Sequence, residues 1–244
     1  MTIVLKLGGS VITEKDHRET VDRDAVRQIA ADVGAASTTD LVLVHGGGSF
    51  GHPAAAERGV SRTSGTTAAA DVRAIHDAMG DLLRAVIEAL GSAGVPAIPV
   101  RPLSLARRSA SGELRLETGP IRAMREEGFV PVLHGDVVAS AGKGATIVSG
   151  DELVVAVAEG LDAERVGLCS TVPGVLDDEG AVVPSITAYE DVEAILGESE
   201  STDVTGGMAA KVRALLDADR PASIFGPGEV AAFLDGETPG TRIG

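Results

Sequence analysis

The segment Leu41-Val-Leu-Val-His-Gly-Gly-Gly-Ser-Phe-Gly-His52 joins a continuous apolar run to a glycine-rich turn. The apolar run is typical of a buried strand, and the glycines allow the backbone to bend tightly and approach a ligand. Pro53 and the alanines after it can open a helix, because proline is tolerated in a first turn. A strand, a glycine turn and a helix start in this order predict an anion-binding site, since free N–H groups and the helix dipole attract negative charge.

The same turn also matches a dinucleotide-binding fingerprint, with the spacing Gly46-x-Gly48-x-x-Gly51. That fingerprint requires a second strand carrying an acidic residue about 20 positions later, which holds the ribose. Here the apolar residues between 68 and 91 recur at helical spacing and predict one long amphipathic helix. Asp71 would lie near the start of that helix, where an acid is favourable for the helix dipole. The context therefore argues against an NAD-dependent enzyme.

Length and composition indicate a cytoplasmic α/β protein. A chain of 244 residues can form one large domain or two closely packed lobes. We find no apolar run of membrane-spanning length, and the start Met1-Thr-Ile-Val-Leu-Lys-Leu7 enters a strand directly, so we expect neither a membrane segment nor a signal peptide. The single cysteine, Cys169, lies in a strand-like run and is expected to be a small core residue.

The charge balance is strongly acidic, with 36 carboxylates, 21 basic residues and a formal net charge of −15. Nucleic-acid binding is disfavoured, because phosphate backbones require a basic surface. Only Lys6, Lys15, Lys143 and Lys211 are lysines, which fits either a GC-rich genome or adaptation to high salt. We favour adaptation to salt, where an acidic surface stays hydrated and its self-repulsion is screened.

Predicted strands and helices alternate along the chain. This alternation indicates an α/β fold with three αβα layers around a mostly parallel sheet. With no low-complexity linker and no repeat, residues 1–244 should form one unit with two lobes, at about 1–160 and about 161–244. We expect strands near 2–7, 41–45, 96–100, 129–133 and 164–169, helices near 22–36, 68–91, 119–127, 150–159, 189–196 and 206–218, and a hairpin arm at 112–117.

Two lysines and one aspartate stand at predicted junctions between elements. Lys6 ends the first strand, at the edge where open α/β sheets bind ligands, and Gly8-Gly9 follow it. Lys211 lies in the first turns of the last long helix, where a lysine is unfavourable for the dipole unless an anion is bound nearby. Asp151 follows a strand and either caps a helix or pairs with a lysine.

These motifs together resemble the amino-acid kinase superfamily. The resemblance rests on Lys6-Leu-Gly-Gly-Ser10 with Lys15, His45-Gly-Gly-Gly-Ser-Phe-Gly-His52, Ser149-Gly-Asp151 and Thr205-Gly-Gly-Met-x-x-Lys211, which occur in order over nearly the whole chain. The run that ends in His52 is similar to the archaeal isopentenyl phosphate kinases. This resemblance implies transfer of a phosphoryl group from ATP to isopentenyl phosphate, in isoprenoid biosynthesis by an alternative mevalonate route. The chain has no Walker A motif, so the transfer would lie outside the P-loop class.

The resemblance also implies a role for each motif residue. The attacking phosphate oxygen is already ionised, so catalysis requires alignment and charge neutralisation, for which lysines, N–H groups and magnesium are suited. Lys15 would stabilise the transition state, and Asp151 would orient lysines or help to organise the metal. Magnesium would be held mostly by nucleotide oxygens, with no metal site of protein ligands alone. The implied acceptor-phosphate ligands are His52, Gly47 and Gly150, and the implied ATP ligands are Lys6, Leu7, Gly8, Gly9, Ser10, Gly48, Thr171, Gly207 and Lys211.

Other features are less specific. Many relatives carry an acid-rich turn where this chain has Ser170-Thr-Val-Pro-Gly-Val175, so base and ribose recognition is not indicated by these residues. His45, His76 and His134 are expected to be structural, and His17 and Lys143 to be solvated. The chain has few aromatic residues, so aliphatic side chains would line the pocket for the isoprenoid tail. Candidates are Ile75, Met79, Val137 and Ile147, although each could equally be ordinary core.

Three functions remain open from the sequence. The first is the kinase acting on isopentenyl phosphate, and the second is a related kinase acting on an acyl amino acid or a phosphonate. The third is a non-catalytic nucleotide-binding module, which the joint presence of Lys6, Lys15, His52 and Lys211 disfavours. A homodimer is a further expectation of the resemblance.

Overall fold

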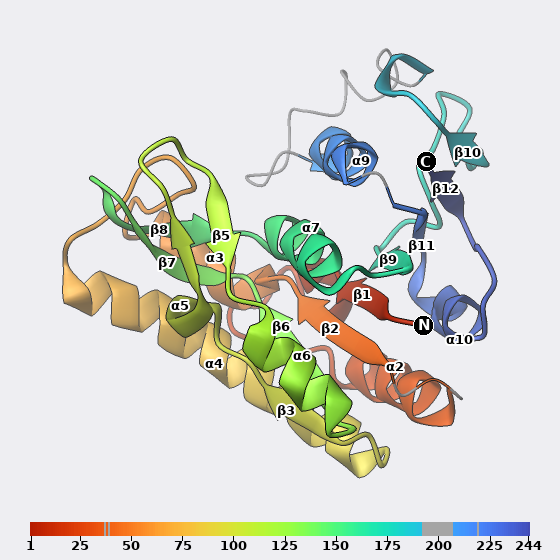
Figure 1. The fold of residues 1–244 in the computed structure, drawn as a ribbon, viewed down its shortest axis with the longest axis horizontal. Coiled ribbons are helices and arrows are strands. Elements are labelled where there is room, and N and C mark those ends of the chain that lie inside the picture. The colour runs from red at the N-terminus through yellow and green to blue at the C-terminus, as the bar shows by residue number, and fades with distance from the viewer. Residues whose placement is uncertain (37, 39, 192–206, 219) are drawn as a thin grey trace.

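The structure is a computed structural model that describes residues 1–36, 38, 40–191, 207–218 and 220–244. Within these ranges the strands form one sheet of eight and one sheet of four (Figure 1). In the larger sheet β11 and β12 form the single antiparallel pair, and all other neighbouring strands pair parallel. The mostly parallel sheet predicted from the sequence is therefore confirmed. Its spatial order is β10 (Ser185–Ile186), β12 (Thr241–Ile243), β11 (Ala222–Phe225), β9 (Arg165–Cys169), β1 (Ile3–Leu7), β2 (Leu41–His45), β6 (Val130–His134) and β3 (Ala97–Pro99).

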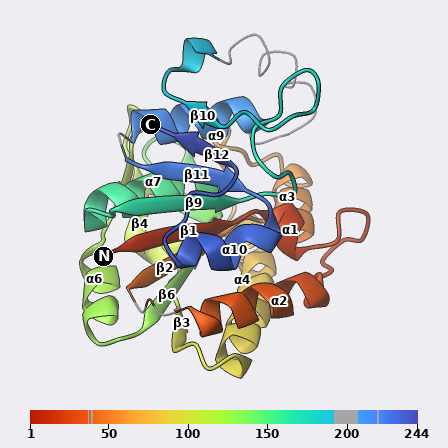
Figure 2. The same ribbon diagram turned by 90° about the vertical axis from the view of Figure 1, so that its right-hand side faces the viewer.

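Helices cover both faces of this sheet, which confirms the predicted three layers (Figure 2). The central strands are buried on both sides, and their alternate residues pack into two separate cores. In β1, for example, Ile3 and Leu5 join one core and Val4 joins the other. The first core contains side chains of α2 (Arg23–Ala35), α4 (Ala69–Ser92) and α10 (Val230–Leu234), and the second contains side chains of α6 (Gly119–Glu126), α7 (Gly150–Leu161) and α9 (Gly207–Asp217).

The four-stranded sheet continues from the carboxyl end of β6. Only Gly135 separates β6 from β7 (Asp136–Ser140), and β7 pairs antiparallel with β8 (Gly144–Val148). On the other side of β7 lie β4 (Ala106–Arg108) and β5 (Leu114–Leu116), which pair as an antiparallel hairpin. A hairpin arm was predicted at 112–117, but that range holds only the second strand, and the first strand, β4, was not predicted. The remaining short elements are α1 (Gly9–Ile12), α3 (Gly48–Ala56), α5 (Pro102–Leu105), η1 (Tyr189–Asp191) and η3 (Pro227–Glu229).

The structure agrees with most of the predicted elements and adds others. All five predicted strands are present, and the helix that argues against an NAD-dependent enzyme is α4, with Asp71 in its first turn. The short strands β7, β8, β11 and β12 were not predicted as separate elements. At 189–196 the described part is the 3₁₀ turn η1 rather than an α-helix, and residues 192–196 lie outside the described ranges. Gly206, the expected start of the last long helix, also lies outside them.

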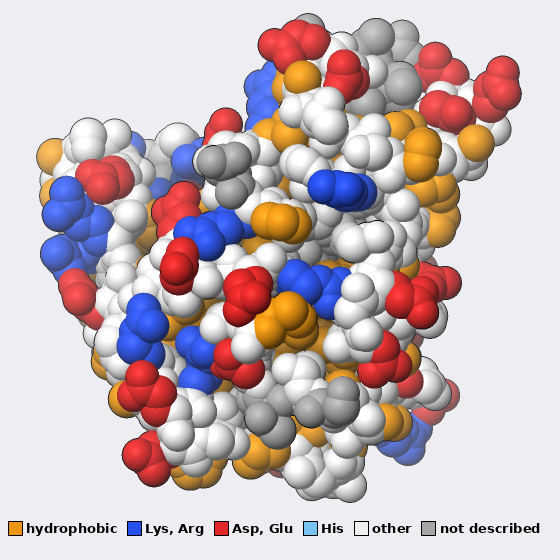
Figure 3. Space-filling model, turned by 45° about the vertical axis from the view of Figure 1, so that its right-hand side comes forward, with side chains coloured by type: hydrophobic (Ala, Val, Ile, Leu, Met, Phe, Trp, Pro, Cys, Tyr) orange, Lys and Arg blue, Asp and Glu red, His pale blue; other side chains and the backbone are white. Residues whose placement is uncertain are grey.

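The surface and the lone cysteine match their expected character. Acidic and basic side chains are interspersed over the face shown in Figure 3. Cys169 is buried in β9, and its burial raises the pKa of the thiol to about 12, so it is a core residue and not a nucleophile. Among the described residues, every helix is either too short or too polar to cross a bilayer.

Candidate active site

A cavity of about 210 Å³ opens at the carboxyl edge of the main sheet, where β1, β2 and β6 end beside one another. This is the edge at which parallel α/β sheets bind ligands. The cavity brings together residues from at least six separate parts of the chain. Its lining includes the predicted site residues Lys6, Gly8, Gly9, Ser10, Lys15, Gly47, His52, Gly150, Asp151, Thr171 and Lys211.

Two glycine turns meet at this edge with their backbones in direct contact. A β-carbon on Gly9 would lie 2.2 Å from the amide nitrogen of Gly48, and one on Gly46 would lie 2.7 Å from the amide nitrogen of Gly9. Gly48 also has a φ of +46°, which non-glycine residues rarely adopt. Thr13 fastens the contact, because its hydroxyl donates to the Gly9 carbonyl at 2.8 Å and accepts from the Ser49 amide at 3.0 Å. The turn after β1 and the turn after β2 are thus one packed unit.

Replacing Gly9 with alanine is expected to disrupt both turns, because the added methyl group overlaps the backbone of Gly48. Overpacking of this kind lowers the free energy of unfolding by about 1–3 kcal/mol. Displacing the turns should also lower kcat/KM by about 10²-fold, as misplacement by roughly 1 Å does elsewhere. Urea unfolding and steady-state kinetics measure the two effects. Gly91→Ala is the control, since nothing lies within 4 Å of its added methyl group, and it should leave activity unchanged.

A buried ion pair lies at the floor of the cavity. The Lys6 ammonium group donates to Asp151 Oδ1 at 2.7 Å, and Lys6 is only 5% exposed. Burial opposes ionisation of the Asp151 carboxyl, but the charges of Lys6, Lys211 and His52 outweigh it and lower its pKa. Asp151 therefore stays ionised and gathers three cationic side chains around one point. The pairing expected for Asp151 is confirmed.

The N-terminus of α7 faces the cavity. Ser149 is its N-cap: the hydroxyl accepts from the Glu152 amide at 3.1 Å, and the Glu152 carboxylate accepts from the Ser149 amide at 3.0 Å. Asp151 lies in the first turn, so the capping role left open for it belongs to Ser149. The amides of Gly150 and Asp151, the first two of the helix, have no acceptor within it and are available to an anion.

The remaining cations surround the same space. Lys15 and His52 are exposed residues of the lining, and the ring of His52 lies beside Gly47. Lys211, in the second turn of α9, donates to the Gly207 carbonyl at 3.2 Å and reaches the cavity. Thr205 and Gly206, which belong to the same motif, lie outside the described residues. The structure thus brings the four predicted cations to one cavity.

Three of the predicted nucleotide ligands are not in the lining. Leu7 is 2% exposed and packs in a core, while Gly48 lies against the back of the turn after β1. Gly207 meets the site through its carbonyl, which holds Lys211. Lining residues that were not among the predicted ligands include Gly46, Gly51, Gly135, Asp136 and Ser170, of which Gly135 and Asp136 belong to none of the motifs. The signal that could have found Asp136 is its place directly after a buried strand that ends in a glycine turn.

Aliphatic side chains also line the cavity. Among them are Ile75 and Met79 of α4 and Ile147 of β8, three of the four candidates for the aliphatic pocket. Gly51 allows Met79 to approach, because a β-carbon there would lie 2.6 Å from the Met79 sulfur. Val137 is fully buried in a cluster with Ile75 and is not in the lining, so it is ordinary core.

Two buried histidines support the edge from below. His45 and His134 are register partners at the ends of β2 and β6, and their rings stack at 5.6 Å. The Nδ1 atom of His45 is 3.0 Å from the Gly46 carbonyl, which confirms the structural role expected for His45 beneath the turn. Burial, reinforced by His134, lowers the pKa of His45 to about 3, so this ring is neutral.

The other polar positions have structural or surface partners. His76 Nδ1 lies 2.9 Å from Asp136 Oδ2, and this hydrogen bond raises the pKa of His76. His17 pairs with Glu14 on the surface, and Lys143 is exposed in the turn between β7 and β8. None of these four side chains except Asp136 lines the cavity.

Stability should fall between pH 6 and pH 5 because of His45. In the unfolded chain a histidine binds a proton below about pH 6.5, whereas folded His45 binds one only near pH 3. The unfolded state therefore holds the extra proton in this window, and lowering the pH favours unfolding by about 1 kcal/mol per unit for this group. Urea unfolding at both pH values measures the slope. His45→Asn should reduce it, and an unchanged slope in that variant would contradict the assignment.

The donor set of the cavity fits a magnesium ion that arrives with a nucleotide. Within the described ranges, histidine, cysteine and carboxylate side chains form no cluster of three or more that could hold a metal. The lining has two carboxylates, of which Asp151 pairs with Lys6 and Asp136 with His76. Mg²⁺ often binds through one or two carboxylates together with substrate phosphates and water. Of these two carboxylates, Asp151 is the one that lies beside a lysine, Lys6.

Comparison with known proteins gives one consistent result. The model of the amino acid kinase family matches residues 1–222. The isopentenyl phosphate kinase of Haloferax volcanii is 60% identical over 243 residues, covering 99% of this chain and 98% of that one, and the enzyme of Methanothermobacter thermautotrophicus is 36% identical over 262 residues with 99% and 98% covered. An X-ray structure of isopentenyl phosphate kinase superposes with a TM-score of 0.86 at 31% identity, with all of both chains covered. By sequence and by fold, this chain belongs to the amino acid kinase family.

Proposed function

We propose that this protein transfers the γ-phosphoryl group of ATP to isopentenyl phosphate, yielding isopentenyl diphosphate and ADP. The observation that carries the proposal is a single cavity lined by both basic and aliphatic side chains. The basic side chains are Lys6, Lys15, Lys211 and His52, and the aliphatic ones include Ile75, Met79 and Ile147. A phosphate monoester with a short branched hydrocarbon tail has the matching chemistry. The full-length similarity to isopentenyl phosphate kinases supports the same reaction.

The acceptor phosphate would bind between the second glycine turn and the start of α7. Its ligands would be His52, the backbone of Gly47 and the free amides at Gly150, with the dipoles of α3 and α7 directed at the anion. An acceptor bound this way would place its hydrocarbon tail against Ile75 and Ile147, and this contact would remove apolar surface from water. Because its oxygen is already ionised, no side chain has to remove a proton from the nucleophile.

The nucleotide would bind along the first glycine turn. Lys6 and Lys211 would hold its β- and γ-phosphates beside Gly8-Gly9-Ser10, and Lys15 would neutralise charge on the phosphoryl group during transfer. Magnesium, held by phosphate oxygens and reached by Asp151, supplies further charge neutralisation when bound. The role of the chain itself is to align two anions that would otherwise repel each other.

A coupled ADP-release assay in high salt, with ATP and magnesium, tests the proposal. The acceptor panel contains isopentenyl phosphate, dimethylallyl phosphate, an acyl amino acid and an alkyl phosphonate. We expect turnover with the isoprenoid phosphates and none with the acyl amino acid. Turnover of the acyl amino acid or the phosphonate alone would assign a related kinase. Nucleotide binding without turnover of any acceptor would assign a non-catalytic module.

We also propose a cytoplasmic homodimer that works in isoprenoid biosynthesis and in concentrated salt. The acidic composition and the similarity to a Haloferax protein support the salt adaptation. Sedimentation equilibrium in high and low salt tests the dimer, which should give twice the 24.7 kDa mass of one chain. A mass of one chain at all concentrations would reject it.

A further inference from the structure

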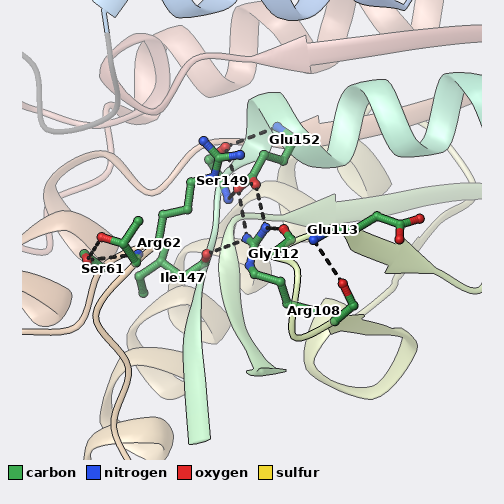
Figure 4. A network of polar contacts seen from close by, with 10 residues as sticks. Ser61, Arg62, Arg108, Gly112, Glu113, Ile147, Ser149 and Glu152 are labelled. Atoms are coloured by element: carbon green, nitrogen blue, oxygen red, sulfur yellow. Dashed lines mark hydrogen bonds and ion pairs between the residues drawn. The ribbon is translucent and has the colours of Figure 1, made fainter. Parts of the chain in front are cut away.

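We infer that Arg108 is a positioning residue that ties the start of α7 to the apolar wall of the cavity, and thereby sets which acceptors fit. The inference rests on the proposed function, because it concerns how the same cavity holds the head and the tail of its acceptor. Arg108 does not line the cavity. It acts through Glu152 and the backbone of Ile147, which Figure 4 shows beside its guanidinium group together with Gly112.

Arg108 is an unusually buried arginine, with 5% of its surface exposed. Its guanidinium group forms a two-pronged pair with Glu152, at 2.9 Å to Oε1 and 3.3 Å to Oε2. The same group donates to the carbonyl of Ile147 at 3.0 Å and to that of Gly112, in the loop of the hairpin arm, at 3.1 Å. The three bonds to Glu152 and Ile147 thus connect the hairpin arm to segments that border the cavity, while the bond to Gly112 holds Arg108 to its own loop.

Glu152 carries the connection into the anion site. Its carboxylate accepts from the Ser149 amide and completes the capping box that starts α7. Between these two residues lie Gly150 and Asp151, which line the cationic part of the cavity. A shift of the Glu152 carboxylate would therefore move the helix start that binds the acceptor phosphate and the carboxylate that holds Lys6.

Ile147 links Arg108 to the aliphatic lining of the cavity. Its side chain lines the cavity while its carbonyl accepts from Arg108, and its amide donates to the Ser61 carbonyl at 3.0 Å. Ile147 and Gly150 are three residues apart in the chain, and one guanidinium group fixes both sides of the turn between them. The separation between the tail wall and the phosphate site is thus set by Arg108, and this separation decides how long an acceptor can be.

The neighbouring arginines provide matched controls. Arg62 donates to the same Glu152 oxygen at 3.0 Å, but its side chain is 70% exposed. Within the part of the chain that the structure describes, it forms no hydrogen bond with Ile147 or Gly112. Arg107 precedes Arg108 on β4, is 57% exposed, and pairs with Glu117 on the surface. Exposed pairs of this kind contribute little to stability or geometry.

The test compares Arg108→Met with Arg107→Met and Arg62→Met. Kinetics are measured with isopentenyl phosphate, with a shorter and a longer alkyl phosphate, and with varied ATP. In Arg108→Met we expect KM for isopentenyl phosphate to rise about tenfold and the preference over the other two acceptors to fall by a similar factor, because the head and tail sites lose their fixed spacing. The KM for ATP should stay within about twofold, and both controls should resemble the wild type. Arg108→Lys should recover only part of the preference, since an ammonium group cannot form the two-pronged pair.

Hydrogen exchange of the bonded amides of Ile147, Ser149 and Glu152, within 147–152, gives a readout that does not depend on activity. Arg108→Met, and Glu152→Gln if the first variant fails to fold, should lose protection there, whereas Arg107→Met should not. An equal loss of kcat/KM for all three acceptors, a matching rise in KM for ATP, or unchanged protection at 147–152 would overturn the inference. If the wild type turns over no isoprenoid phosphate, the proposed function fails, and the exchange data still decide whether Arg108 positions the start of α7.

Discussion

Lys6→Met should lower kcat by about 10³–10⁵-fold, the range observed when a cation that neutralises a transferring phosphoryl group is removed. Lys6 is the cation of the cavity that is most deeply placed, at the end of the central strand β1. Methionine keeps the length and the apolar stem of the side chain, so the change removes little more than the charge. Single-turnover kinetics with isopentenyl phosphate and saturating ATP measure the effect on the chemical step.

The same substitution should lower the free energy of unfolding by about 3–5 kcal/mol, because it leaves the carboxylate of Asp151 without its 2.7 Å partner. Adding Asp151→Asn removes the unpaired charge and should restore part of the stability without restoring activity. Lys143→Met, at an exposed position between β7 and β8, serves as the matched control and should change neither quantity. A double variant that regains both stability and activity would show that Lys6 has a structural role only and no role in the transfer.

His52→Ala should lower kcat/KM for isopentenyl phosphate by about 10²–10³-fold, the loss expected when one donor to a developing phosphate charge is removed. His52 lies in the lining at the second glycine turn, opposite the turn that follows Lys6. ATP affinity, measured by calorimetry in high salt, should stay within about twofold. His52→Gln keeps a hydrogen-bond donor and should recover part of the activity.

The control for His52 is His17→Ala, which removes a surface histidine outside the cavity and should behave as the wild type. Loss of ATP affinity in His52→Ala would assign the ring to the nucleotide rather than to the acceptor. Full activity in His52→Ala would remove the argument that the acceptor is itself a phosphate. The two outcomes are separable because binding and turnover are measured with the same preparation.

The sequence predicts the parts of the site that depend on local patterns. Lys6 and His52 were predicted from their places at, or shortly after, the end of a buried strand, and both line one cavity because parallel strands end at the same edge of the sheet. Their roles in that cavity stay predictions. The main sheet was predictable for the same reason, since its strands are continuous apolar runs separated by amphipathic helices. Short strands such as β12 carry too few residues to show a period.

The parts of the site that the sequence does not predict depend on contacts between distant segments. Arg108 and Glu152 are 44 positions apart, and neither shows from the sequence that it will be buried with the other. The sequence does not indicate that Asp136 contacts His76, because the two residues are 60 positions apart and only the fold brings them together. Leu7 shows the opposite problem, because a residue inside a binding motif can have its side chain in the core and contribute only its backbone.

The position of β1 at the centre of the sheet has a consequence for synthesis on the ribosome. β1 is made long before β9, with which it pairs on one side, and the Gly8 amide donates to the carbonyl of Cys169. Lys6 and its glycine turn therefore lack the neighbours that β9 supplies until β9 has been made. Parallel pairing over such sequence separations is slow to form. Until β9 is available, β1 has an unpaired apolar edge, and such edges can pair with the wrong strand. The folding step that completes the proposed nucleotide site is therefore also the step at which the chain is most prone to aggregation.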